Sequence, residues 1–275
     1  MNNELIAKKS KWSFLVLLTQ SGYLAILGLA SFVVLTAFSS VSILGIYATV
    51  LSALNLFNYM SDLGIAAWII HKPQVTDTDL STAFWLQTFL SLIAIFLGYY
   101  LAPGLLRSYV ELPPNSLELY YAILVSFALV TLRAIPSVLL EKDHEIYKVA
   151  IVSSIEGTIF YLMVIILTLL EFGIWALIYA VIVRSIFGTL VIYILKPWRP
   201  KLTFSFNAMV AMLKYGLPLQ SNSFIAVVKD DLLIVFLGSR LGLVNLGYIQ
   251  FGKKMGRIRS SACDRQSQSC CLPSF

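Results

Sequence analysis

Residues 173–195 read GIWALIYAVIVRSIFGTLVIYIL, an apolar stretch that contains a single charged residue, Arg184. A helix needs about 20 apolar residues to cross a hydrocarbon core of about 30 Å. This stretch is therefore predicted to span a membrane. Arg184 lies eleven residues from either end. That is about 16 Å along the helix axis, too far for its side chain to reach the membrane surface easily.

The whole chain has the same character. Of its 275 residues, 59% are hydrophobic and 12% are charged, and the mean hydropathy is +0.83. This composition excludes an ordinary water-soluble fold. We predict an all-α, polytopic membrane helix bundle of about eight helices, the last one incomplete, with no cleaved signal peptide at the N-terminus. The predicted spans are roughly 12–38, 43–61, 81–103, 118–140, 150–170, 173–195, 215–237 and a short final segment 241–251.

The basic residues fall almost entirely on one side of these spans. Fourteen lysines and arginines precede or follow the spans on the N-terminal side of the membrane, against two, Arg107 and Arg240, on the other. The positive-inside rule then places the N-terminus and the long loops in the cytoplasm. The predicted location is the bacterial inner membrane. The fourteen are Lys8, Lys9, Lys11, Lys72, Lys142, Lys148, Lys196, Arg199, Lys201, Lys214, Lys253, Lys254, Arg257 and Arg259.

The net charge of +6 is explained by this asymmetry, and binding to nucleic acid is not expected. The sequence contains no Gly-rich phosphate loop, no His-Glu-x-x-His and no nucleophile elbow. We therefore expect no catalytic residue, no metal and no cofactor. All three cysteines lie in the last thirteen residues, so no disulfide framework supports the fold.

Charged residues inside the predicted spans are the candidate functional residues. A charge at the centre of a membrane helix costs about 2.5–3.5 kcal/mol on insertion scales, so it needs a partner or a watery cavity. Lys229, Asp230 and Asp231 are consecutive and point in three directions around their helix. For Arg184 and Lys229 the favoured interpretation is a functional cavity. Two deep cations suit an anionic headgroup such as a phosphate.

Arg133 and Glu156 leave two interpretations open. Each lies about six residues from the cytoplasmic end of its predicted helix, where a long side chain can reach the interface. They could pair and only hold helices together, since polar contacts between membrane helices are worth about 0.6–2 kcal/mol. They could also belong to the functional cavity.

The chain divides into three predicted regions. Residues 1–200 form a first lobe of six helices, and a weak internal repeat indicates that residues 201–255 begin a second lobe, with the Pro-containing segment 196–201 as a hinge. Residues 256–275 abandon the earlier composition, which predicts a chain cut short by a disrupted reading frame. The alternative is a palmitoylated or metal-binding cysteine tail.

Seven short motifs, spread over residues 8 to 255, carry a resemblance to a known family. In their order and spacing the chain resembles the Wzx-like polysaccharide flippases of the multidrug/oligosaccharidyl-lipid/polysaccharide superfamily, relatives of the MATE drug exporters. Within that family it looks like the branch of colanic-acid and teichuronic-acid exporters. The motifs are KWSF at 11–14, SDLG at 61–64, DLSTAFW at 79–85, FGIWAL at 172–177, WRP at 198–200, YGLP at 215–218 and DDLLI at 230–234.

The resemblance implies a fold, a substrate and roles for the charged residues. Family members have two pseudo-symmetric six-helix lobes and move an undecaprenyl-pyrophosphate-linked oligosaccharide across the cytoplasmic membrane by alternating access. By this resemblance Arg184, Lys229 and Arg133 would bind the substrate, and Glu156, Asp230 and Asp231 would couple transport to a proton or sodium ion. The chain departs from the family in lacking most of the second lobe, so it is expected not to transport alone.

Two other functions are kept as alternatives. A MATE-like drug exporter is the nearest, although its cationic substrates fit poorly beside arginine and lysine. A non-transporting membrane fragment, or a scaffold for a glycan-assembly complex, is the other. The expected partners are the lipid-linked oligosaccharide, membrane lipid, and polysaccharide polymerase or export proteins.

Overall fold

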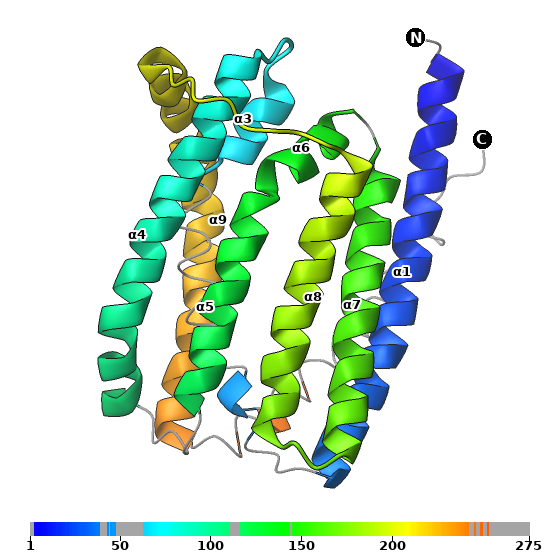
Figure 1. The fold of residues 1–275 in the computed structure, drawn as a ribbon, viewed down its shortest axis with the longest axis vertical. Helices are drawn as coiled ribbons and strands as arrows, with labels where there is room; N and C mark the ends of the chain where they lie inside the picture. The colour runs from blue at the N-terminus through cyan, green and yellow to red at the C-terminus, as the bar shows by residue number, and fades with distance from the viewer. Residues whose placement is uncertain are drawn as a thin grey trace, which may run out of the picture.

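The computed structural model describes residues 3–38, 43, 45–47, 63–109, 116–143, 145–241, 245, 248–249 and 252. In these ranges the regular elements are all helices (Figure 1). This agrees with the predicted all-α membrane bundle. The predicted span 43–61 and the final segment 241–251 lie largely outside the described residues. The helices are α1 (Asn3–Phe38), α3 (Ile65–His71), α4 (Asp77–Tyr109), α5 (Ser116–Leu132), α6 (Ala134–Lys142), α7 (Ile146–Leu169), α8 (Ile174–Leu195) and α9 (Phe206–Leu241).

Four of the described helices are long and apolar enough to cross a membrane, and a bent pair makes a fifth candidate span. The four lie in α1, α4, α7 and α8, each overlapping a span predicted from the sequence. Helix α9 contains the predicted span 215–237 but begins earlier, at Phe206. The chain is therefore a multi-pass membrane protein.

The predicted span 118–140 is not one straight helix. It breaks at Arg133, and α5 and α6 meet there at an angle of 45°. Pro136 explains the break, because proline has no N–H to bond the carbonyl four residues earlier, which belongs to Leu132. That carbonyl accepts a hydrogen bond of 2.8 Å from the Tyr193 hydroxyl of α8 instead. The neighbouring helix thus satisfies the polar group that the proline frees, as a membrane requires.

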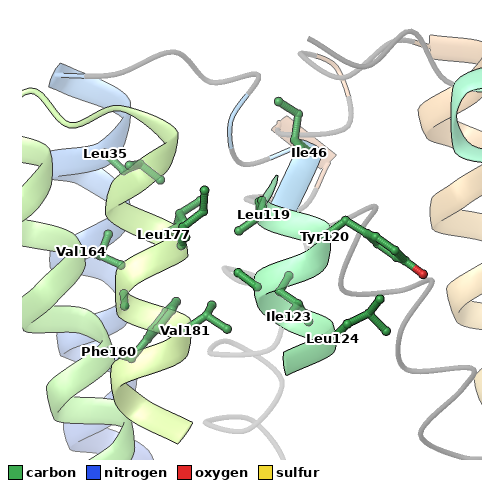
Figure 2. Close-up of a cluster of buried hydrophobic side chains, with 13 residues drawn as sticks. Leu35, Ile46, Leu119, Tyr120, Ile123, Leu124, Phe160, Val164, Leu177 and Val181 are labelled. Atoms are coloured by element: carbon green, nitrogen blue, oxygen red, sulfur yellow. The ribbon is translucent and has the colours of Figure 1, made fainter. Parts of the chain in front are cut away.

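The helices pack around two hydrophobic clusters. The first, here named the α7–α8 cluster, joins α1, α5, α7 and α8 (Figure 2). The second, the α3–α4 cluster, joins α3, α4, α6 and the first turns of α9. The α7–α8 cluster includes Leu35, Leu119, Ile123, Phe160, Val164, Leu177 and Val181. The α3–α4 cluster includes Ile65, Trp68, Ile69, Phe84, Ile135, Val138 and Met212.

One end of the bundle collects the basic segments. The C-terminal ends of α3, α6 and α8 and the N-terminal ends of α4 and α7 lie at the same end as the N-terminus (Figure 1). These helix ends carry the lysines predicted to share one side of the membrane. Arg107 and Arg240 belong to the last turns of α4 and α9, which lie at the opposite end.

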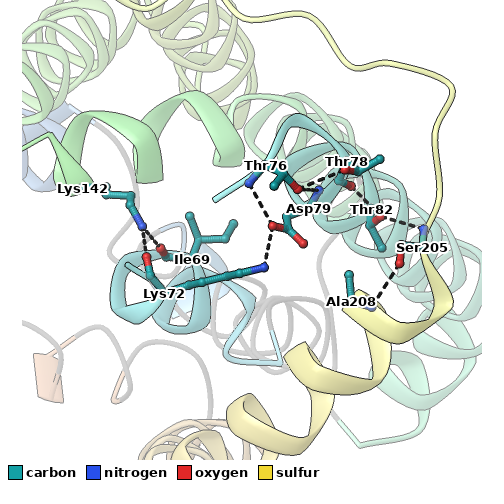
Figure 3. A network of polar contacts seen from close by, with 9 residues as sticks. All are labelled: Ile69, Lys72, Thr76, Thr78, Asp79, Thr82, Lys142, Ser205 and Ala208. Carbon is teal, nitrogen blue, oxygen red and sulfur yellow. Dashed lines mark hydrogen bonds and ion pairs between the residues drawn. The ribbon is translucent and has the colours of Figure 1, made fainter. Parts of the chain in front are cut away.

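A polar network at the basic end fixes α3, α4 and α6 to one another (Figure 3). Asp79 accepts a hydrogen bond of 2.9 Å from the Thr76 amide, and its own amide donates to the Thr76 hydroxyl at 3.2 Å. This reciprocal pair caps the N-terminus of α4. Asp79 also pairs with Lys72 at 2.6 Å. The Lys142 ammonium of α6 donates to the carbonyls of Ile69 and Lys72, which closes the C-terminus of α3.

Residues 196–205 connect α8 to α9 and lie against α4. The Lys201 amide donates to the Ser81 hydroxyl at 3.1 Å, and the Ser205 amide donates to the Thr82 hydroxyl at 3.0 Å. The Trp85 indole donates to the Lys201 carbonyl at 3.0 Å. The connection that includes the predicted hinge is therefore held to α4 by hydrogen bonds between its backbone and the side chains of Ser81, Thr82 and Trp85.

Helix α9 crosses the start of α3 at very short distance. Gly64 has a φ of 74°, and a Cβ atom at this position would lie 2.6 Å from the Cα of Gly216 in α9. A positive φ and the absence of room both favour glycine here. The rings of His71 and Tyr215 pack beside this crossing, with centroids 5.7 Å apart.

Candidate functional site

Arg184 lies at the middle of α8, ten residues after its first residue and eleven before its last. The loop between α7 and α8 is only four residues long, and the two helices run antiparallel and side by side (Figure 1). The Arg184 guanidinium carbon lies 5.0 Å from the centre of the Phe160 ring of α7. A cation above an aromatic face is attracted by the ring quadrupole, typically by about 0.5–2 kcal/mol. This contact holds the guanidinium at the level of Phe160.

A cavity of about 330 Å³ lies next to Arg184. Helices α1, α7 and α8 form its walls, together with Tyr47. Apart from Arg184, the lining is mainly aliphatic, aromatic and small. It consists of Leu24, Gly28, Ser31, Phe32, Leu35, Tyr47, Gly157, Phe160, Tyr161, Val164, Leu177 and Arg184.

Arg184 forms no ion pair with any acidic residue whose side chain the structure describes. The Arg184 side chain ends in a planar cation with five N–H donors. The position therefore holds a positive charge beside an open space, in surroundings of low dielectric constant where electrostatic attraction is strong. What the arrangement can do chemically is attract an anion.

Arg133 and Glu156 lie against one another. The Arg133 guanidinium contacts both carboxylate oxygens of Glu156, Nη1 with Oε1 and Nη2 with Oε2, the latter at 3.1 Å. Their side chains are 15% and 18% exposed. Such a two-pronged arginine–carboxylate pair is among the stronger polar contacts in proteins. Of the two interpretations left open by the sequence, the geometry places these residues in a pair; their roles in binding or coupling stay predictions.

Gly188 of α8 makes room for this pair. A Cβ atom on Gly188 would overlap the Glu156 carboxylate and the Arg133 guanidinium. Nothing in the sequence marks Gly188 as a site residue, because a glycine within an apolar helix has no chemical signature of its own. Its spacing from Arg184 is the one usable signal, since residues four apart share a helix face.

The break between α5 and α6 is what brings Arg133 to this position. The Arg133 amide bonds the Val130 carbonyl at 3.3 Å, a tightened last turn, and its carbonyl accepts from Ser137 in the first turn of α6. In the last turn of α5, the Leu129 carbonyl accepts a hydrogen bond of 3.2 Å from the Thr189 hydroxyl of α8. These contacts fix the position of Arg133 against α7 and α8.

The other three predicted site residues lie in α9. The backbone of Lys229, Asp230 and Asp231 is helical, and their side chains lie outside the description. Whether they meet Arg184 is thus not tested. Among the side chains that the structure does describe, no group of three histidine, cysteine, aspartate or glutamate residues could hold a metal ion.

Comparison with known proteins adds one finding. Neither the curated proteins nor the solved structures include one that matches the chain. A family model described as "Polysaccharide biosynthesis protein" matches residues 34–275. This range contains α3 to α9, the cavity residues from Leu35 onward, and the cysteine-containing tail. The chain belongs to this family of polysaccharide biosynthesis proteins.

Proposed function

We propose that the protein moves an undecaprenyl-pyrophosphate-linked oligosaccharide from the cytoplasmic to the outer leaflet of the bacterial inner membrane. The observation that carries the proposal is Arg184, a mid-membrane cation beside a cavity and free of ion pairs with the described acidic side chains. Family membership supports a role in polysaccharide biosynthesis and says nothing finer about the step.

Moving a pyrophosphate group from water into the membrane costs a large free energy unless a positive charge in the protein pairs with it. Arg184 offers that charge, with several N–H donors suited to phosphate oxygens. The remaining cavity wall is mostly apolar, with Phe32, Tyr47, Phe160 and Tyr161 among its members. This combination suits a molecule that has an anionic group beside a hydrocarbon chain. The long polyprenyl tail would stay in the bilayer.

The distribution of basic residues supports the proposed orientation. The lysine-rich helix ends gather at one end of the bundle, which the positive-inside rule assigns to the cytoplasm. Arg184 then lies about halfway between the leaflets, where a substrate would pass during alternating access. A cationic drug would be repelled at this position, which disfavours the MATE-like alternative.

The proposal is tested by Arg184→Ala. In the purified 275-residue chain in lipid nanodiscs, the substitution is expected to weaken binding of undecaprenyl pyrophosphate at least tenfold, because charge-assisted hydrogen bonds are worth about 1.5–3 kcal/mol. In a full-length version that exports polysaccharide, the same substitution is expected to stop export while the amount of protein in the membrane stays the same.

Arg240→Ala is the matched control. The Arg240 guanidinium also lies over an aromatic ring, 5.9 Å from the centre of Phe236, but Arg240 is exposed in the last turn of α9 and does not line the cavity. Binding and export should remain unchanged in this variant. If Arg184→Ala behaves like Arg240→Ala, Arg184 has only a structural role and the proposal fails.

A further inference from the structure

The charged residues of α7 and α8 are arranged in two levels. On α7, Glu156 and Phe160 are four residues apart and share one face; on α8, Arg184 and Gly188 do the same. Because the helices are antiparallel, Gly188 faces Glu156 while Arg184 faces Phe160. The Glu156 carboxylate therefore lies about one helical turn, roughly 6 Å along the axis, from the level of Arg184.

Glu156 is the nearest acidic residue to Arg184 along these two faces. An arginine side chain is long and flexible, and a displacement of one turn is within its reach. A carboxylate also has two oxygens, so it can accept from different guanidinium groups. In the structure both oxygens lie against the Arg133 guanidinium, and Oε2 accepts a hydrogen bond from it. Arg133 comes from the break between α5 and α6 rather than from α7 or α8.

We propose that Arg133 is a positioning residue for the anion site, and that it acts by keeping Glu156 away from Arg184. The inference rests on the proposed function, in which an anionic headgroup binds at Arg184. Without Arg133, Arg184 is the described cation that lies one turn away along the facing sides of α7 and α8. The headgroup would then compete with a carboxylate that is part of the protein and always present.

Gly188 belongs to the same arrangement. The α8 backbone approaches the Arg133–Glu156 pair so closely at Gly188 that no side chain fits. The pair is therefore confined to its own level of the α7–α8 interface. Arg133 and Arg184 carry like charges and repel one another, which favours keeping the two guanidinium groups at separate levels.

The test compares Arg133→Gln, Glu156→Gln and the double variant in the 275-residue chain in lipid nanodiscs, with undecaprenyl pyrophosphate as the probe. Arg133→Gln releases the carboxylate and is expected to weaken probe binding at least about tenfold. Glu156→Gln removes the competitor and should bind within about threefold of the parent chain, or more tightly. The double variant should regain the affinity of Glu156→Gln.

A purely structural pair predicts a different pattern. If the double variant binds as weakly as Arg133→Gln, or if Arg133→Gln binds like the parent chain, the inference is wrong. Should Arg133→Gln fail to fold, Glu156→Gln still decides, because a tenfold loss there contradicts competition. Lys201→Gln, which breaks the exposed pair with Asp77, is the control for losing an ion pair as such.

Arg184→Ala, measured beside these variants, separates the two proposals. If Arg184→Ala binds the probe like the parent chain, the proposed function fails. If Arg184→Ala loses binding and Arg133→Gln keeps it, only the role of Arg133 fails.

Discussion

The interface between α7 and α8 is closed at the level of Gly188 and open at the level of Arg184. At the closed level, Arg133 and Glu156 form an ion pair, and a Cβ atom on Gly188 of α8 would overlap both side chains. One turn away, Arg184 lies over Phe160 beside a cavity of about 330 Å³. Two arginines in the same bundle thus have opposite situations. The difference comes from the residue that α7 places opposite each arginine, Glu156 for Arg133 and Phe160 for Arg184.

The largest effect is expected when a glycine is replaced by alanine at each of the two levels and the losses of stability are compared. Gly188→Ala should destabilise the protein by about 4 kcal/mol or more, because it overpacks the helix contact and disrupts a buried ion pair. Gly157→Ala, at the cavity, places a Cβ atom 2.5 Å from the end of the flexible Leu24 side chain, which also lines the cavity. Its effect should stay within about 1 kcal/mol. The free energy of unfolding in mixed micelles measures both.

Equal losses in the two glycine variants would mean that the interface is closed along its whole length. The cavity beside Arg184 would then have no room to offer a ligand. The amounts of both variants in the membrane fraction should be compared first, so that a failure to insert is not mistaken for a loss of stability.

A smaller difference is expected between the two arginines. Arg133→Ala leaves Glu156 without its partner and should cost about 3 kcal/mol of unfolding free energy. Arg184→Ala removes only the contact with the Phe160 ring and should cost about 1 kcal/mol. Thermal unfolding of the two variants in the same detergent gives the order. A reversed order would show that Arg184, not Arg133, is the structural cation.

The smallest effect on stability is expected at Tyr193, a little more than one turn after Gly188 in α8. Tyr193→Phe removes the hydroxyl that bonds the Leu132 carbonyl and leaves the ring in place. A single hydrogen bond of this kind contributes about 1 kcal/mol. Unfolding experiments should detect this loss without any change in probe binding. A loss of binding would instead indicate that the break between α5 and α6 controls the anion site.

Much of the bundle could be predicted from the sequence because span length and apolar composition are set by the membrane itself. The depth of Arg184 follows directly from its distance to the two ends of its span. The break at Arg133 was missed, although Pro136 lies three residues later, because membrane helices often accommodate a proline when a neighbour satisfies the freed carbonyl. That neighbour, Tyr193, is 61 positions from Leu132 along the chain.

The pairing of Arg133 with Glu156 could not be predicted either. Their helices are adjacent in the chain, but the rotation of each helix about its axis depends on packing that no single-sequence pattern reports. Gly188 shows the same limit, since its importance comes from what lies opposite it. Lys229, Asp230 and Asp231 stay predictions, because their side chains lie outside the description.

The attachment of residues 196–205 to α4 has a mechanical consequence. The connection just before α9 is hydrogen-bonded to Ser81, Thr82 and Trp85 of α4. A rotation of the start of α9 is therefore transmitted to α4 and is not absorbed by a flexible linker. The first turns of α9 and helices α3, α4 and α6 would then rotate together as one rigid body. The kink at Arg133 joins this rigid body to α5 and the α7–α8 cluster. A rotation of the rigid body would therefore displace Arg133, the residue paired with Glu156.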